Sequence, residues 1–346
     1  MSKKNPTMND VARAAGVNAS TVSRVMNPET RGMVSDEVAK RILLEAKKLG
    51  YRPNRAASTL RTRRSKVVGV VLPDITNAVF PPILMGLEEG LRQHGYLAIV
   101  VNVGTDEEEQ RFVLNRLLGQ QVDGLVFATA KRTDPLVLEC AHRGTPVVTV
   151  NRSEESGQVS CIVSDEAHGM RLAVSHMAEW GHRRLAHIAG PDDLSTGHSR
   201  RLGFQSAVRA LGLDPDQCVV LPSTGYTREA GKTALLKLLA QHPDVTGVIA
   251  GNDLVALGCY DALKALGLPC PGHLSIIGHN DMPLMDMVDP PLTTVRIQHH
   301  DLGLEAARLL LHAIESPAAP VVEVALKSVL VARQSCAEPR SADPAQ

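Results

Sequence analysis

The sequence predicts a small all-α head followed by a larger α/β body of two similar lobes, each an open parallel sheet with helices on both faces. Three observations predict this organisation. Short helical periodicities fill residues 7–50. From Lys66 onward, nearly continuous Val/Ile runs alternate with amphipathic helices, which is typical of strands buried on both faces. From Glu166 the same alternation begins again.

The charges are divided unevenly, although the chain of 346 residues is neutral overall. Residues 1–64 contain 14 Lys/Arg and 5 Asp/Glu, whereas residues 65–346 contain 23 and 32. A basic head on an acidic body suggests that the head binds a polyanion, the alternative being a solvated, lysine-rich terminus. The chain has no apolar run of 18 residues, no apolar segment of a secretory signal and no Cys-x-x-Cys. We therefore expect a cytoplasmic protein with reduced thiols.

Residues 7–27 contain two short helical runs joined by a tight turn. Thr7 and Asn18 are placed to cap the first and second helix, respectively. The second helix turns Val22 and Val25 inward, and its outward face carries Ala19, Ser20, Ser23, Arg24 and Asn27. A helix with one polar, cation-bearing face, held against another helix, is the helix-turn-helix geometry that enters a DNA major groove. Two ordinary helices of a bundle are the alternative.

A third helix is predicted over residues 36–49, with an apolar stripe of Val38, Ile42, Leu43 and Ala46. The segment after it is polar, and Leu60 is its one large apolar side chain among several arginines. A helix this short is unstable alone and would form on docking. Leu60 suits wedging between base steps of a minor groove; a flexible interdomain linker is an equal alternative.

The chain resembles the lactose-repressor/galactose-repressor family of bacterial transcription regulators over about residues 7–335. The resemblance is carried by Thr7-Met-Asn-Asp-Val-Ala, Ala15-Gly-Val, Thr21-Val-Ser-Arg-Val-Met-Asn27, Gly50-Tyr-Arg-Pro-Asn-Arg55 and Ala57 to Leu60. It implies that the second helix reads the major groove, and that the linker folds into a hinge helix on DNA with Leu60 in the minor groove. The DNA-binding residues it implies are Thr7, Asn18, Ala19, Ser20, Thr21, Ser23, Arg24, Asn27, Asn54, Arg55, Ala57 and Leu60. Ala19 and Ser20 are shorter than the readers of some relatives, so the bases they read stay open.

Strands and helices alternate regularly in the body. The expected strands are 67–73, 97–102, 124–129, 146–151 and 161–165, then 183–190, 218–223, 245–253 and 274–280. Helices of the second cycle are expected at 166–180, 200–211, 227–241 and 253–266. Ligands of such sheets bind beyond the carboxyl ends of the strands. The residues after those ends are rich in amides and hydroxyls, with an aromatic ring in each lobe, which suits a polyhydroxy ligand. Each of them alone could be an ordinary loop or capping residue.

The resemblance implies contacts to a small effector at six of these positions, namely Phe80, Asn151, Arg200, Tyr226, Asn252 and Asn280. The sequence departs from the family at Gly278-His-Asn-Asp281, where relatives carry Gly-Tyr-Asp-Asp or Gly-Phe-Asp-Asp, and at Asn151, where an acid is common. These departures leave two fewer carboxylates beside Arg200 and Arg152. We therefore expect a sugar acid rather than a neutral sugar, with Arg200 holding its carboxylate bidentately.

The resemblance also implies a body of the periplasmic-binding-protein type, in which the chain crosses between lobes three times. The domains expected are a helix-turn-helix domain at 1–52, a hinge at 53–65, a first lobe at 66–165 plus about 297–325, and a second lobe at 166–296 plus about 326–336. The run Pro290 to Arg296 marks the return towards the first lobe. Residues 337–346 are expected to be disordered and carry no heptad pattern, which favours a homodimer over a tetramer.

No enzyme, metal site or cofactor is expected. A phosphate loop is excluded because five residues, not four, separate Gly225 from Gly231. The sequence has neither a metal-binding His/Cys cluster nor a Gly-x-Ser-x-Gly motif. We expect a repressor rather than an activator, bound to pseudo-palindromic double-stranded operator DNA and controlled by a sugar or sugar acid. A sugar-binding transport or chemoreceptor protein and a sugar-processing enzyme with a DNA-binding head are the alternatives.

Overall fold

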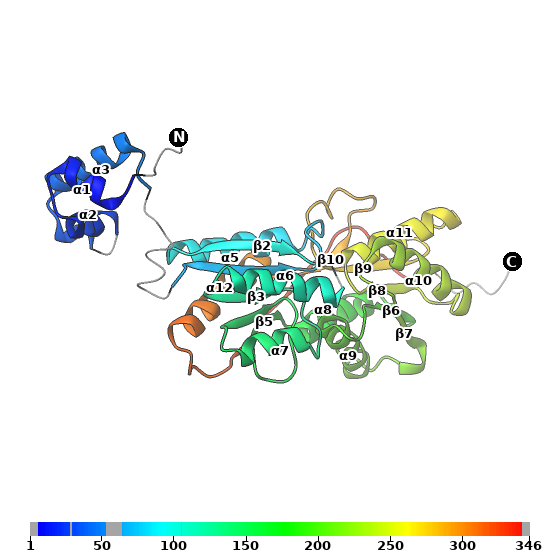
Figure 1. Ribbon diagram of the computed structural model, residues 1–346. Helices are drawn as coiled ribbons and strands as arrows, with labels where there is room; N and C mark the ends of the chain where they lie inside the picture. Colours follow the sequence, from blue (N-terminus) through cyan, green and yellow to red (C-terminus); the bar gives the residue numbers. More distant parts are fainter. Residues whose placement is uncertain (1–5, 28–29, 53–63, 105, 341–346) are drawn as a thin grey trace. The chain divides into compact units, whose positions relative to one another are not determined.

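The computed structural model describes residues 6–27, 30–52, 64–104 and 106–340. The chain divides into two compact units, residues 1–65 and 66–346, which we call the head and the body (Figure 1). Among the described residues, no helix is both long and apolar enough to cross a membrane.

The head is a small helical domain. Its elements are α1 (Met8–Ala15), α2 (Ala19–Met26), η1 (Arg31–Met33) and α3 (Asp36–Leu49). Thr7 and Asp10 form a reciprocal capping box at the start of α1, which confirms the predicted cap. The core is built from small aliphatic side chains, namely Val11, Ala12, Ala15, Val22, Val25, Ala39, Ile42 and Ala46. The predicted stripe of α3 is wrong at Leu43, which is 48% exposed, because Ala39 points inward instead.

The first lobe of the body contains a six-stranded, fully parallel sheet. Its strand order is β11-β5-β4-β3-β1-β2. The strands are β1 (Val67–Leu72), β2 (Leu97–Asn102), β3 (Gly124–Phe127), β4 (Val147–Val150), β5 (Ser160–Ser164) and β11 (Glu323–Leu326). Helices α5 (Phe80–Gln93) and α12 (His299–Glu315) bury one face of the sheet, and α6 (Glu107–Gly119) and α7 (Pro135–His142) bury the other.

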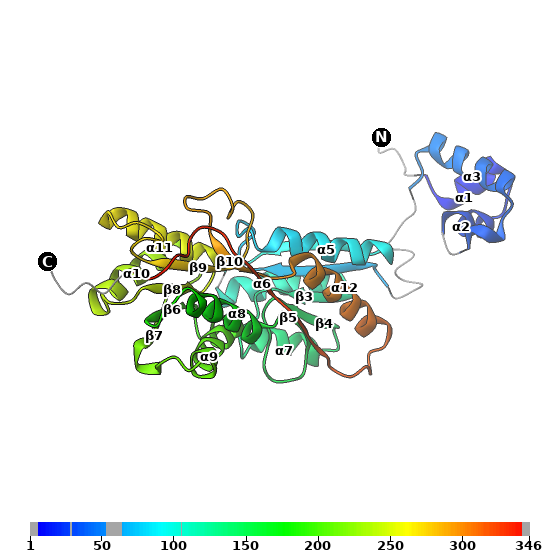
Figure 2. The same ribbon diagram turned by 180° about the vertical axis from the view of Figure 1, so that it is seen from behind.

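The second lobe repeats this plan with the order β12-β10-β9-β8-β6-β7. Its strands are β6 (Leu185–Ala189), β7 (Cys218–Pro222), β8 (Gly247–Ala250), β9 (Ser275–Asn280), β10 (Thr293–Arg296) and the antiparallel β12 (Val329–Val331). Helices α10 (Arg228–Gln241) and α11 (Asp253–Leu266) cover one face, and α8 (Glu166–Glu179) and α9 (Ser195–Ala210) cover the other; η2 (Pro215–Gln217) precedes β7. Figures 1 and 2 show the two sheets at opposite ends of the body. The predicted fold class is confirmed.

A pair of helices in each lobe packs at very short distance through glycines. A Cβ atom on Gly86 of α5 would lie 2.0 Å from the carbonyl oxygen of His300 in α12. In the second lobe, a Cβ on Gly258 of α11 would lie 1.9 Å from the carbonyl oxygen of Arg228 in α10, and Gly231 meets Val255 in the same way. Real Cβ atoms do not approach so closely, so these positions need glycine. Gly231 therefore has a packing role, independent of any phosphate.

The chain passes from one sheet to the other at three places, after β5, after β10 and after β11. The three connections are bonded to each other. The backbone N–H of Asp165 donates to the carbonyl of Leu326 at 2.8 Å, and the side-chain amide of Gln298 lies 3.5 Å from the carbonyl of Lys327. The two lobes are thus joined by three neighbouring chain segments, which together form one hinge.

Candidate functional site

Helix α2 presents a polar face in the head. Asn18, Ser20 and Arg24 are exposed, while Ala19, Thr21, Ser23 and Asn27 are partly buried. The face is held in position by Val22 and Val25, which pack into the core. Thr7, also among the predicted DNA-binding residues, is exposed at the start of α1.

Asn18 occupies the cap position of α2, but its side chain makes no capping hydrogen bond. The predicted cap position is thus confirmed, but the Asn18 side chain forms no bond that caps the helix. Its exposed amide stays available to an outside partner, as does the Arg24 guanidinium, for which the described residues supply no ion pair. Asn54, Arg55, Ala57 and Leu60, predicted for the hinge, lie outside the described residues.

Arg200 lies at the centre of the polar residues in the second lobe. Its Nε and Nη2 donate to the two carboxylate oxygens of Glu166 at 2.7 and 2.8 Å. Nη2 also lies 3.3 Å from Oδ1 of Asn280, and Nη1 donates to the carbonyl of Gly251 at 2.6 Å. The guanidinium carbon is 5.9 Å from the centre of the Tyr226 ring. Three predicted effector residues, from α9, from the loop after β7 and from the end of β9, therefore converge.

The ion pair of Arg200 with Glu166 is buried, with 3% and 7% of the two side chains exposed. Burial by itself would raise the pKa of Glu166, but Arg200 and then His279 lower it to about 2. Nε2 of His279 lies 3.0 Å from the same carboxylate. Glu166 occupies the Nε/Nη2 edge of Arg200, so this edge is not open to the carboxylate of an effector in this structure. One N–H of Nη1 remains for which the described residues supply no bond.

The other predicted effector residues have different surroundings. Asn252 accepts a hydrogen bond from the Val255 backbone at 2.9 Å through Oδ1, so it caps α11 and keeps only its amide NH₂ for a ligand. Phe80 is 2% exposed and packs in the core of the first lobe. Asn151 follows β4 with a φ of 66°, in the left-handed region, and is 9% exposed. Phe80 and Asn151 come from the first lobe and, within the described part of the chain, make no hydrogen bond to the group around Arg200.

The two lobes are joined by hydrogen bonds close to this group, along what we call the interlobe seam. The backbone N–H of Arg132 donates to the carbonyl of Asp193 at 2.9 Å. The backbone N–H of Ser153 donates to Oγ of Ser195 at 2.9 Å. A side-chain N–H of Arg132 also reaches the Asp192 carbonyl at 3.3 Å. These residues follow β3, β4 and β6, so the seam joins the carboxyl ends of both sheets.

Sequence reasoning missed Glu166 and did not assign a role to Arg152. Glu166 is the first residue of α8 and reads as an ordinary acid in the first turn of a helix. Its partner Arg200 is 34 residues away, so only the fold brings them together. From the sequence, Arg152, a cation immediately after a strand, was placed beside Arg200 but was not included among the six predicted effector contacts.

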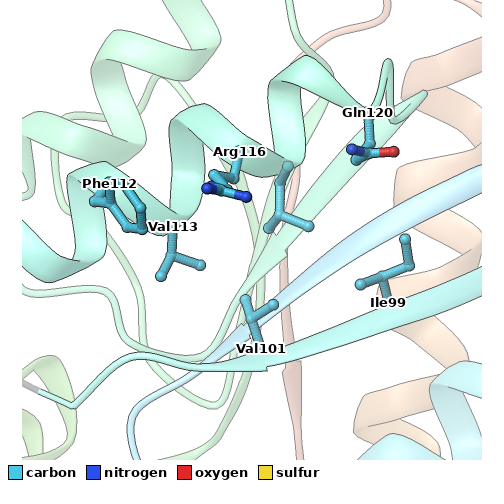
Figure 3. A pocket seen from close by; sticks show the side chains of 7 residues that line it. Ile99, Val101, Phe112, Val113, Arg116 and Gln120 are labelled. Carbon is cyan, nitrogen blue, oxygen red and sulfur yellow. The ribbon is translucent and has the colours of Figure 1, made fainter.

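A separate hollow of about 250 Å³ lies on the first lobe between β2 and α6 (Figure 3). It is mostly apolar and is lined by Ile99, Val101, Phe112, Val113, Arg116, Leu117 and Gln120. None of the predicted effector residues contributes to it. Phe112 at its rim is 61% exposed, and Leu97, Ile99 and Val100 of the edge strand β2 are also exposed.

Comparisons with known proteins agree with this arrangement of a helical head on a two-lobed body. Residues 7–54 match the model of bacterial regulatory proteins of the lacI family, and residues 174–336 match a periplasmic binding protein-like domain. The chain is 34% identical to the HTH-type transcriptional regulator CelR of Thermobifida fusca, over 96% of this chain and 99% of that protein. It is 30% identical to the ribose operon repressor of Halalkalibacterium halodurans, over 95% and 96%.

A solved structure described as a CelR–cellobiose complex superposes with a TM-score of 0.73 at 31% identity, covering 96% of this chain and all of that one. The two relatives named above match over nearly their whole length and are DNA-binding regulators, which decides against the two alternative classes. The chain belongs to the lacI family of bacterial regulatory proteins and is a DNA-binding transcriptional regulator.

Proposed function

We propose that this regulator is a repressor whose affinity for operator DNA is controlled by a small polyhydroxy effector bound between the lobes. The observation that carries the proposal is the convergence of Arg200, Tyr226 and Asn280 beside the interlobe seam. The names of the relatives, a ribose operon repressor and a CelR–cellobiose complex, support a sugar or sugar derivative as effector.

The effector contacts proposed are Phe80, Asn151, Arg200, Tyr226, Asn252 and Asn280. Since most of them are shielded from solvent, entry of a ligand requires the seam to open. An effector that favours one angle between the lobes changes operator affinity through a coupling of typically 1–3 kcal/mol. We propose the lobe limits given above, 66–165 plus about 297–325 and 166–296 plus about 326–336, as the moving parts.

On the DNA side, we propose that the polar face of α2 reads the major groove. Arg24 has the longest side chain with hydrogen-bond donors on this face, and Asn18 and Ser20 are also exposed there. Asn54, Arg55, Ala57 and Leu60 are proposed as hinge contacts, with Leu60 as a minor-groove wedge. Thr7, Ala19, Thr21, Ser23 and Asn27 complete the proposed interface.

We further propose that the regulator is a cytoplasmic homodimer. One head carries a single recognition helix of eight residues, whereas a pseudo-palindromic operator presents two half-sites about 34 Å apart. The apolar hollow of Figure 3 and the open edge of β2 are suited to a second copy of the body, because exposed sheet edges normally need cover.

The proposal is tested by fluorescence anisotropy of labelled promoter DNA from the regulator's own genomic neighbourhood, with neutral sugars, sugar acids and sugar phosphates added in turn. We expect nanomolar-range specific binding that one of these ligands changes at least fivefold. A ligand that changes operator binding in the native chain but not in Arg200→Ala would support the site. Specific DNA binding that no such ligand alters would refute control by a polyhydroxy effector.

A further inference from the structure

Arg152 occupies the interlobe seam. It follows Asn151, whose left-handed backbone turns the chain away from the end of β4. The next residue, Ser153, is bonded through its N–H to Ser195 of the second lobe at 2.9 Å. The side chain of Arg152 thus starts from the first lobe at a point where the second lobe is in direct contact.

The Arg152 side chain is half-buried, and its guanidinium lies within electrostatic reach of groups of the second lobe. Its electrostatic neighbours are Tyr226, Asp193 and Arg200, and burial, the dominant effect, lowers its pKa. Its Nε is shielded from solvent and has no hydrogen-bond partner. Across residues 6–27, 30–52, 64–104 and 106–340, no carboxylate oxygen lies within 4 Å of its nitrogens.

The other arginines around the seam are all matched by acids. Arg200 is paired with Glu166, and Arg132 with Glu155. Arg201 is paired with Asp192. A cation that is partly withdrawn from water without a partner is costly, so proteins normally neutralise it by an ion pair or by ligand binding. Among these arginines of the interlobe seam, Arg152 is therefore the one whose charge a bound ligand would balance.

We propose that the effector carries an oxyanion, a carboxylate or phosphate, which Arg152 binds, while its hydroxyl groups face Asn280, Asn252 and the remaining Nη1–H of Arg200. This inference rests on the proposed function and names the ligand class of that site. Arginine binds carboxylates and phosphates through two parallel N–H bonds, which gives direction as well as strength. The internal partner Glu166 leaves Arg200 to recognise neutral groups, so the two arginines have different roles.

The test compares matched ligands that differ in charge. Glucose, glucuronate and glucose 6-phosphate form one series, and ribose, ribonate and ribose 5-phosphate form another. Isothermal titration calorimetry on the full chain should show one acid or phosphate binding about 10- to 100-fold more tightly than its neutral parent, as expected for a hydrogen-bonded charge pair. Comparing the sugar acids with the sugar phosphates shows whether the preferred oxyanion is a carboxylate or a phosphate. That preference should weaken as the salt concentration rises.

Arg152→Gln should abolish the preference for the anion while leaving affinity for the neutral parent within about twofold, since only the charged contact is lost. Arg152→Lys should keep part of the preference, because lysine keeps the positive charge but lacks the planar guanidinium with its two parallel N–H donors. Arg143→Gln, at an exposed arginine of the same lobe, is the matched control and should bind like the native chain. The melting temperature of each ligand-free variant should match that of the native chain, which shows that all three are folded.

The inference is overturned if a neutral sugar binds as tightly as its anions and Arg152→Gln changes neither. In that case a polyhydroxy effector still controls the protein and only the charge assignment fails. If no member of either series binds or alters operator affinity, both the oxyanion and the proposed function are rejected. If Arg152→Gln lowers the melting temperature of the ligand-free protein and affects both ligand classes equally, Arg152 is a structural residue and the inference is likewise wrong.

Discussion

Glu166 and Arg200 form a buried, bidentate ion pair that bridges the first residue of α8 and the first turns of α9. His279 of β9 contacts the same carboxylate, so three elements of the second lobe meet at one charge. The pair neutralises the arginine from inside the protein. It is therefore part of the lobe's folded structure before any ligand arrives.

Replacing Glu166 by Gln should destabilise the body strongly. The change leaves the Arg200 guanidinium buried without its counter-charge, which typically costs 3–5 kcal/mol. Urea unfolding can be followed by fluorescence of Trp180, the one tryptophan, which lies at the end of α8 and so reports on the body. Glu107→Gln, at an exposed acid of α6, is the control and should stay within about 0.5 kcal/mol of the native chain. An equal effect of the two substitutions would contradict a special role of the buried pair.

The same carboxylate should make stability depend on pH in the acid range. The pKa of Glu166 falls from 4.5 to about 2 on folding, so its ionised form favours the folded state. Its contribution is complete above about pH 4.5 and is lost as the pH falls towards 2. The free energy of unfolding of Glu166→Gln, measured from pH 6 to pH 2, should fall less steeply than that of the native chain. Parallel curves would show that Glu166 is not the group responsible.

Arg24→Ala should remove most sequence-specific binding. A bidentate arginine–base contact typically contributes 1–3 kcal/mol of discrimination, and the proposed dimer carries two copies. Operator and scrambled DNA are compared by fluorescence anisotropy at one salt concentration, because the phosphate contribution depends strongly on salt. Arg41→Ala, at an exposed arginine of α3, should lower affinity for both DNAs similarly or not at all. Unchanged operator preference in Arg24→Ala would show that α2 is not the recognition helix.

Phe112→Glu should weaken self-association. A charge at the rim of the β2–α6 hollow would have to be buried in the proposed contact between two bodies. Sedimentation velocity should show a shift towards monomer and anisotropy a loss of operator affinity, while the melting temperature changes little because Phe112 is 61% exposed. Leu202→Glu, at a 46% exposed leucine of α9, is the control. A Phe112→Glu protein that remains dimeric would place the dimer contact elsewhere.

Ser195→Ala should weaken effector binding without unfolding the protein. It removes the acceptor of the part-buried Ser153 N–H in the seam, and an unpaired donor costs roughly 1–3 kcal/mol when fully shielded from water. If closure accompanies binding, calorimetry should report about 5- to 100-fold weaker affinity. Ser206→Ala, at an exposed serine of the same helix, should have no effect. Native affinity in Ser195→Ala would mean that this part of the seam does not close on the ligand.

Most of the fold could be predicted because its signals are local. The Val/Ile runs gave the strands of both sheets to within a few residues, since strands buried on both faces need apolar side chains at every position. Helix α9 begins at Ser195, five residues before its predicted start, because Ser195–Ser199 lacks an apolar stripe and Gly197 instead packs tightly against the Pro191 carbonyl. Strand β10 was missed because its neighbours β9 and β12, rather than its own sequence, define it.

The site was less predictable because it depends on distant partners. The strand-end rule correctly pointed to Arg200, Tyr226 and Asn280, which do converge. It could not reveal that Glu166 holds Arg200, since the two lie 34 positions apart and nothing between them indicates the pairing. Nor could it distinguish an exposed ring from a core residue at Phe80, because both follow a strand end.

The hinge has a consequence for how the protein is made. The first lobe starts at β1, but its helix α12 and its edge strand β11 follow β6 to β10 of the second lobe in the chain. During synthesis on the ribosome, the first lobe therefore cannot complete its fold until nearly all of the second lobe has been made. The described helices of the head all lie within residues 8–49 and can fold long before. A nascent chain would thus carry a finished DNA-binding domain before it has the body that controls it.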